Sequence, residues 1–180
     1  MVDPASLADL DRVLTMASGA PDRLVVILDD AFAPERNDVV LGAIVALSAG
    51  GVAEIGLSET GDTATPLRVR ALLQDAVGLA RPVPLRMHLR NHDRLGLVKA
   101  IVALKSGVHH FDTTLSGLDG TVATEDLVRL FGGVEVDSPA DADRVTNAAV
   151  ALRLALAPTG VTTPDIATEQ VATNPVGAAG

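Results

Sequence analysis

Two histidines and an arginine stand close together in the stretch MHLRNHDRLGL, residues 87–97. His88 and His92 are four positions apart, and an imidazole can act as a general acid, a general base or a metal ligand near neutral pH. Arg90 lies between them and carries a permanent positive charge whose paired N–H donors fit a carboxylate. The stretch therefore combines acid and base groups with an anion-binding group.

Acidic side chains stand at or near the ends of several apolar runs elsewhere in the chain. Barrel enzymes place their chemistry at the C-terminal ends of parallel strands, so these positions are candidates for one shared site. An acidic residue at a strand end can equally be a helix cap or part of a solvated turn. The expected catalytic residues are Glu59, His88 and His92, and the expected substrate-binding residues are Arg90, Asp29 and Asp112.

Four short apolar runs alternate with amphipathic segments along the chain. The runs are RLVVILDD, GVAEIGLSE, PVPLRMHLR and SGVHHFDTT, at residues 23–30, 51–59, 82–90 and 106–114. Such alternation predicts βα units and a parallel sheet. The pair Gly50-Gly51 predicts the end of the first helix after a strand, and Thr65 followed by Pro66 predicts the start of the second.

The sequence divides into a domain and a tail. Residues 1–157 are expected to form one α/β domain that begins with a helix in SLADLDRVLTMAS and closes with a helix in DADRVTNAAVALRLALA. Residues 158–180 are rich in Thr, Pro, Gly and Ala and show no helical or strand period, which predicts a flexible tail. A chain of 180 residues is also short of the roughly 250 residues of a complete eight-stranded barrel.

Composition excludes several classes of function. The net charge of −9 disfavours a nucleic-acid partner, and an aromatic content of 2% disfavours base stacking. The absence of cysteine removes disulfides, thiolate metal sites and thiol nucleophiles. The start MVDPASLADLDRV is acidic, and no run approaches the roughly 18 apolar residues of a membrane span. We therefore expect a soluble, cytoplasmic protein without a membrane partner.

Three ordered segments resemble the DRE-TIM metallolyase family, and hydroxymethylglutaryl-CoA lyase most of all. EIGLSETGDTATPLRVRALL resembles the strand that ends in Asp-Thr and runs through Ala-Thr-Pro into a helix, and GVHHFDTTLSGLDG with VATEDLVRLFGG resembles the last strand and its helix. The resemblance covers roughly residues 22–133. It implies the second half of a TIM-type (β/α) barrel, with about four parallel strands, that binds a small carboxylate or an acyl thioester.

The metal motif of that family is altered here. The resemblance implies a His-x-His motif, and Arg90 occupies one of its ligand positions whether the motif is counted forward or backward. A guanidinium is a permanent cation that repels a metal ion, so we expect no metal and no other cofactor. The alternative is that His88, His92 and Asp93 rebuild a metal site.

Two functions follow from these expectations. The first is a repurposed lyase or aldolase-type enzyme that works without the ancestral metal. The second is a non-catalytic binding or assembly subunit that completes a barrel with another chain. The run LVVIL is typical of strands buried on both faces. A half-barrel would leave its inner face and both edges open, so we expect a homodimer, with capping by the tail or by another protein as the competing solutions.

Overall fold

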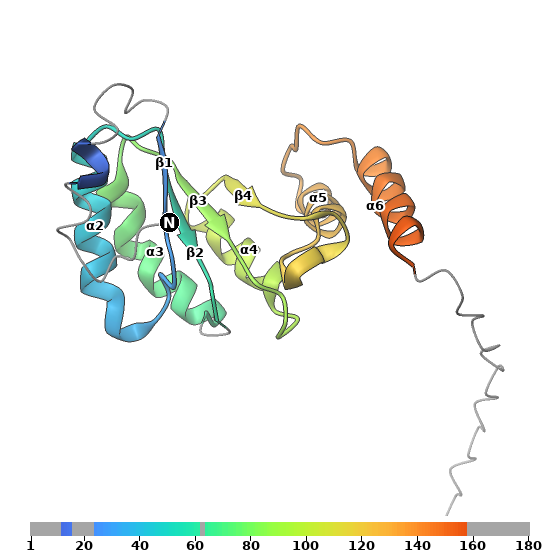
Figure 1. The fold of residues 1–180 in the computed structure, drawn as a ribbon, viewed down its shortest axis with the longest axis horizontal. Helices are drawn as coiled ribbons and strands as arrows, with labels where there is room; N and C mark the ends of the chain where they lie inside the picture. Colours follow the sequence, from blue (N-terminus) through green and yellow to red (C-terminus); the bar gives the residue numbers. More distant parts are fainter. Residues whose placement is uncertain (1–11, 16–23, 62–63, 158–180) are drawn as a thin grey trace, which may run out of the picture.

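The computed structural model describes residues 12–15, 24–61 and 64–157. It contains a four-stranded parallel sheet whose strand order follows the chain (Figure 1). The strands are β1 (Val25–Leu28), β2 (Glu54–Ser58), β3 (Leu85–His88) and β4 (His110–Asp112). The expected α/β half-barrel with four parallel strands is therefore confirmed, although each strand is shorter than the apolar run that predicted it.

Helices follow each strand. They are η2 (Pro34–Arg36), α2 (Asn37–Ala49), α3 (Pro66–Ala80), α4 (Gly96–Lys105), η3 (Leu115–Gly120), α5 (Thr124–Gly133) and α6 (Ala142–Leu156). Residues 12–15 are helical, and the rest of the expected N-terminal helix lies outside the described residues, as does the predicted tail at 158–180.

Local signals in the sequence account for the helix boundaries. The Thr65 hydroxyl accepts the N–H of Arg68 at 3.2 Å, with Pro66 as the first residue of α3. The chain leaves α2 at Gly50, and Gly51 adopts a φ of +70°, which costs glycine little. Both predicted boundaries are confirmed, and they place β2 and β3 beside each other with their ends in line.

The two faces of the sheet differ in chemistry. The buried apolar face packs against α2, α3 and α4 through Val26, Leu28, Ile55, Leu57, Leu85 and Met87. The opposite face, called here the inner face, carries Glu54, Arg86 and His110, because residues two apart in a strand share a face. The expectation of near-continuous apolar strands is therefore wrong for β2 and β3. The exposure of these side chains differs: Glu54 is buried, whereas Arg86 is 31% and His110 48% exposed.

The end of the molecule farthest from α2 is built from η3, α5 and α6 (Figure 1). Within α6, whose residues are all described, Ala149 is the one buried side chain, while Leu154 is 73% exposed. The helix is held by polar contacts: Arg153 pairs with Glu125 at 2.9 Å, and the Ser116 hydroxyl donates to the Ala149 carbonyl at 3.1 Å. Among the described helices, none has the length and apolar character that a membrane crossing requires.

Candidate functional site

The parallel register brings the ends of the strands to one edge of the sheet. Leu28 pairs with Leu57, Ser58 pairs with His88, and His88 pairs with Asp112. Residues that follow these positions leave the sheet at the same edge, where parallel barrels carry their ligands. The direction in which each side chain points then decides whether it can meet a ligand there.

A cluster of charged side chains occupies the inner face across β2, β3 and β4. The inner-face cluster consists of Glu54, Arg86, His88, His110 and Asp112. The guanidinium of Arg86 lies between two carboxylates, 2.6 Å from Glu54 Oε2 and 2.6 Å from Asp112 Oδ1. Nδ1 of His110 contacts the other oxygen of Glu54. One cation therefore links the first position of β2 to the last position of β4.

The inner-face cluster shifts the acidity of two of its members. Burial alone raises the pKa of Glu54, but hydrogen bonds from His110 and Arg86 and the charge of Arg86 outweigh burial, so the pKa of Glu54 is lowered. The hydrogen bond to Asp112, assisted by that to Glu54, raises the pKa of Arg86 despite partial burial. Both groups therefore stay charged at neutral pH, and neither is suited to proton transfer.

His88 and Asp112 lie side by side on the inner face. Nδ1 of His88 lies 4.0 Å from Asp112 Oδ2, and both side chains are about one-third exposed. The other oxygen of Asp112 is bound to Arg86, which holds the carboxylate in place. Asp112 therefore lies beside one ring nitrogen of His88, and an imidazole in this position can act as an acid or base toward a ligand through its second nitrogen.

Glu59 points to the opposite side of the sheet. Its carboxylate is fully buried and lies 2.9 Å and 3.1 Å from Nζ of Lys99, which is also fully buried. It also accepts the backbone N–H groups of Ala64, at 3.3 Å, and Arg90, at 3.0 Å. Lys99 reaches Asp93 Oδ2 at 3.4 Å. This buried ion cluster of Glu59, Lys99 and Asp93 joins the loops after β2 and β3 to α4, and it seals Glu59 away from the inner face.

Lys99 is the residue that the sequence interpretation missed. It occurs in the apolar stretch GLVKAIVALK, on the same side of α4 as the buried Gly96, Ala100 and Ala103. A lysine on the core stripe of a helix requires a buried anion, because an isolated ammonium is too costly to desolvate. Its position on that stripe was therefore a signal that one of the acidic strand ends faces the helices.

Arg90 lies beyond β3 and is held at two points. Leu89 is buried, so the alternation of the extended chain places Arg90 on the same side as His88. Its backbone N–H binds Glu59, and Nη1 donates to the carbonyl of Asp119 in η3. Nε is buried and has no hydrogen-bond partner among the described residues. An orphaned donor of this kind is costly unless a ligand or a water accepts from it.

The remaining candidates do not converge on one point. His92 is exposed, and its ring lies against Gly120, where a Cβ atom would come within 2.0 Å of it. Asp93 faces Lys99, whereas His88 faces Asp112 on the other side of the sheet. Asp29 directly follows β1 and is half-buried.

These placements do not fit the divalent metal of the resembling family. In the described part of the chain, no three His, Asp or Glu side chains are grouped as metal ligands. The ammonium of Lys99 lies 2.9 Å from Glu59 and 3.4 Å from Asp93, so a cation already occupies the space beside two of the carboxylates that a metal ion would need. We therefore derive no step through a metal ion.

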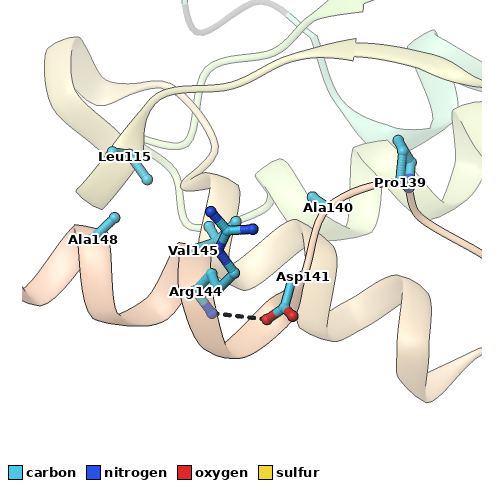
Figure 2. Close-up of a pocket in the computed structure, with 7 residues that line it drawn as sticks. All are labelled: Leu115, Pro139, Ala140, Asp141, Arg144, Val145 and Ala148. Carbon is cyan, nitrogen blue, oxygen red and sulfur yellow. Dashed lines mark hydrogen bonds between the residues drawn. The ribbon is translucent and has the colours of Figure 1, made fainter.

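A separate pocket lies where η3 meets the first turn of α6 (Figure 2). It has a volume of about 430 Å³ and is lined by Leu115, Pro139, Ala140, Asp141, Arg144, Val145 and Ala148. Figure 2 shows the Arg144 side chain standing in this pocket while its backbone N–H binds the Asp141 carboxylate at 2.9 Å. None of the predicted site residues lines it, so the pocket is distinct from the strand-end site.

Two enzymes of known activity are similar to this chain in sequence. The (R)-citramalyl-CoA lyase of Chloroflexus aurantiacus is 32% identical over 122 residues, which cover 63% of this chain and 38% of that enzyme. The cytoplasmic 3-hydroxy-3-methylglutaryl-CoA lyase of Rattus norvegicus is 30% identical over 109 residues, covering 54% and 31% respectively. The chain thus spans less than two-fifths of the length of these relatives. No protein-family model matches it.

Solved structures of HMG-CoA lyases share the fold. The enzyme from Brucella melitensis aligns with a TM-score of 0.74 and 20% identity, covering 83% of this chain and 59% of that one. The enzyme from Acinetobacter baumannii, solved in complex with coenzyme A and 3-methylmalate, aligns with a TM-score of 0.74 and 23% identity, covering 98% and 62%. The resemblance inferred from the sequence is confirmed, and it extends over only part of each barrel.

Proposed function

We propose, from the confirmed resemblance to the DRE-TIM metallolyases, that this chain is a lyase-type enzyme that binds a small carboxylate or an acyl thioester at its strand ends and works without a metal ion. The observation that carries the proposal is the buried Nε of Arg90, which has no hydrogen-bond partner in the part of the chain that the structure describes. A ligand carboxylate supplies the acceptor that this donor lacks, with His88 on the same side of the chain.

His88 and Asp112 supply the proton transfer in this proposal. In a 3-hydroxy acid or its thioester, a ring nitrogen of His88 takes the proton of the hydroxyl group. The carbon–oxygen bond becomes a carbonyl, the adjacent carbon–carbon bond breaks, and its electron pair moves to the carbon beside the carboxyl or thioester group. That carbon then receives the proton from His88. Asp112 stabilises the transient imidazolium, and Arg90 holds the anionic end of the substrate.

The roles expected from the sequence change in two places. The carboxylate of Glu59 already accepts from Lys99 and two backbone N–H groups, so we assign it to support of the loop rather than to acid or base chemistry. The ring of His92 packs on Gly120 and is left without an assigned step. Asp29 remains a proposed substrate contact because it follows β1 at the same edge of the sheet.

Calorimetric titration with 3-methylmalate, with and without coenzyme A, tests the anion site. We expect Arg90→Met to weaken binding by about 2–5 kcal/mol, the loss typical of removing one partner of a buried charge pair. Arg94→Met is the matched control, because Arg94 lies in the same loop and is exposed. Equal affinity in wild type and Arg90→Met would exclude Arg90 as the anion site.

Cleavage of 3-hydroxyacyl-CoA thioesters tests the base. His88→Gln should lower kcat roughly 10²–10⁴-fold, the usual contribution of a positioned acid or base. His109→Gln is the control, since His109 is exposed and lies before β4. Cleavage that survives in His88→Gln at the wild-type rate removes His88 from the mechanism.

An assembly role is the second candidate, favoured by the open sheet. No described strand pairs with the outer edges of β1 and β4, and the inner face is only partly buried. A second copy could close both edges as a symmetric homodimer. Light scattering at micromolar concentration tests this idea, and a monomeric mass would reject the homodimer. A protein that assembles but neither binds nor cleaves thioesters would support the assembly role over the enzymatic one.

A further inference from the structure

The buried ion cluster meets Arg90 through the protein backbone. Glu59 accepts the Arg90 N–H at 3.0 Å with the same oxygen, Oε2, that lies 2.9 Å from Lys99 Nζ. The side chain of Arg90 leaves on the other side of the chain toward η3. The backbone of Arg90 is therefore held, on the side opposite its guanidinium, by the Glu59 carboxylate, whose charge is balanced by Lys99.

The same cluster holds the loops on both sides of that contact. Oε1 of Glu59 accepts the Ala64 N–H, which ties down the loop between β2 and α3. Asp93 binds Lys99 through Oδ2 and accepts the Leu95 N–H at 2.9 Å through Oδ1, which shapes the loop between β3 and α4. Lys99 thus joins two strand-end loops to one helix from a position without any exposure to solvent.

We infer that Lys99 is a positioning residue for the anion site, acting through Glu59 on the backbone of Arg90. The chemical reason is that the fully buried Glu59 carboxylate binds two backbone N–H groups and Lys99 at once. A carboxylate buried without an opposing charge is costly, so loss of the Lys99 ammonium should displace Glu59 and the backbone bound to it. This inference rests on the proposed role of Arg90. It adds that Lys99, through Glu59, determines the position of the Arg90 guanidinium. A purely structural ion pair would influence overall stability without setting the geometry of Arg90.

Nuclear magnetic resonance reports on Arg90 without any ligand. In the wild type we expect the Arg90 and Ala64 amides to exchange with solvent only through global unfolding, because each is bound to the sealed carboxylate. In Glu59→Gln and Lys99→Met we expect faster exchange at both amides and a shifted Arg90 Nε–H resonance. Lys105→Met is the matched control on the same helix, since Lys105 is exposed, and it should leave these signals unchanged.

Binding of 3-methylmalate then completes the test. We expect Glu59→Gln and Lys99→Met to bind at least about tenfold more weakly than wild type, the effect of a displaced but still present guanidinium. Unchanged Arg90 signals in a folded Glu59→Gln or Lys99→Met variant would overturn the inference. If neither variant folds, the wild type provides the test: rapid solvent exchange of its Arg90 amide would by itself overturn the inference about Lys99. If the wild type does not bind 3-methylmalate but the amide and Nε–H signals behave as expected, the proposed function is contradicted and the positioning role of Lys99 is not.

Discussion

Two ionic clusters lie on opposite sides of the sheet, and each holds one cation between two carboxylates. In the inner-face cluster, Arg86 lies between Glu54 and Asp112 and is 31% exposed. In the buried ion cluster, Lys99 lies between Glu59 and Asp93 and is 0% exposed. The two clusters contain similar charges but can serve different purposes. The inner-face cluster is partly exposed and can contact a ligand, whereas the buried ion cluster can only hold the loops in place.

The largest effect is expected at the sealed cation. Lys99→Met leaves Glu59 buried without its cation, and such a change costs about 3–5 kcal/mol of unfolding free energy. Urea denaturation measures this loss. The double variant Lys99→Met/Glu59→Gln should lose less than Lys99→Met, because it removes the orphaned charge while keeping an acceptor. A loss below about 1 kcal/mol for Lys99→Met would contradict the burial argument.

A smaller effect is expected at the inner-face cluster. Arg86→Met removes charged hydrogen bonds from Glu54 and Asp112, and because Arg86 is partly hydrated we expect a loss of about 1–3 kcal/mol. Urea denaturation again provides the measurement, with the exposed Arg129→Met as a control near zero. If Arg86→Met costs as much as Lys99→Met, partial exposure does not weaken the inner-face cluster.

Acid titration separates the inner-face cluster from the rest of the protein. The pKa of Glu54 is below its ordinary value of 4.5 in the folded chain, so its contribution to stability is present above that value and is lost as the pH falls through the folded-state pKa. We therefore expect the stability of Glu54→Gln to fall less steeply than that of wild type below this value. Parallel curves for the two proteins would show that Glu54 is not stabilised in its ionised form.

The smallest effect is expected at the exposed ion pair between α5 and α6. Arg153 is 59% exposed, and pairs of this kind contribute about 0.2–1 kcal/mol. Thermal unfolding of Arg153→Met, with Arg144→Met as a control on the same helix, measures it. If Arg153→Met loses as much stability as Arg86→Met, the exposure of the cation does not determine how much each ion pair contributes. The burial of Glu125 would then explain the loss.

The elements of the fold could be predicted from local patterns. Thr65, Pro66 and Gly50 act through bonds and backbone angles within one turn of the chain, so their meaning is readable without the fold. Strand lengths were overestimated because Asp29 and Asp30 lie in a turn directly after β1, and Val108 and His109 precede the paired segment of β4. Local chemistry therefore determines the position of an element better than its extent.

The candidate site was harder to predict, because a one-residue step along a strand reverses the face. Ser58 shares the inner face with Arg86, whereas Glu59, one position later, turns toward α4. Only the distant Lys99 reveals that choice, since it lies 40 positions further along the chain. His88 and Arg90 could be singled out from the sequence because His88 ends β3, which carries the recognisable motif, and Arg90 follows it two positions later.

The strand order has a consequence for how the chain folds. The strands are adjacent in the sheet in the same order as in the chain. Each new βα unit can therefore pair with the unit made just before it, and no strand pairs only with one made much later. Glu59 is the exception, since its cation arrives only with α4. During synthesis β1 and β2 can pair while the Glu59 carboxylate is still hydrated. Glu59 can become buried with its cation only when β3 and α4 have docked on the sheet.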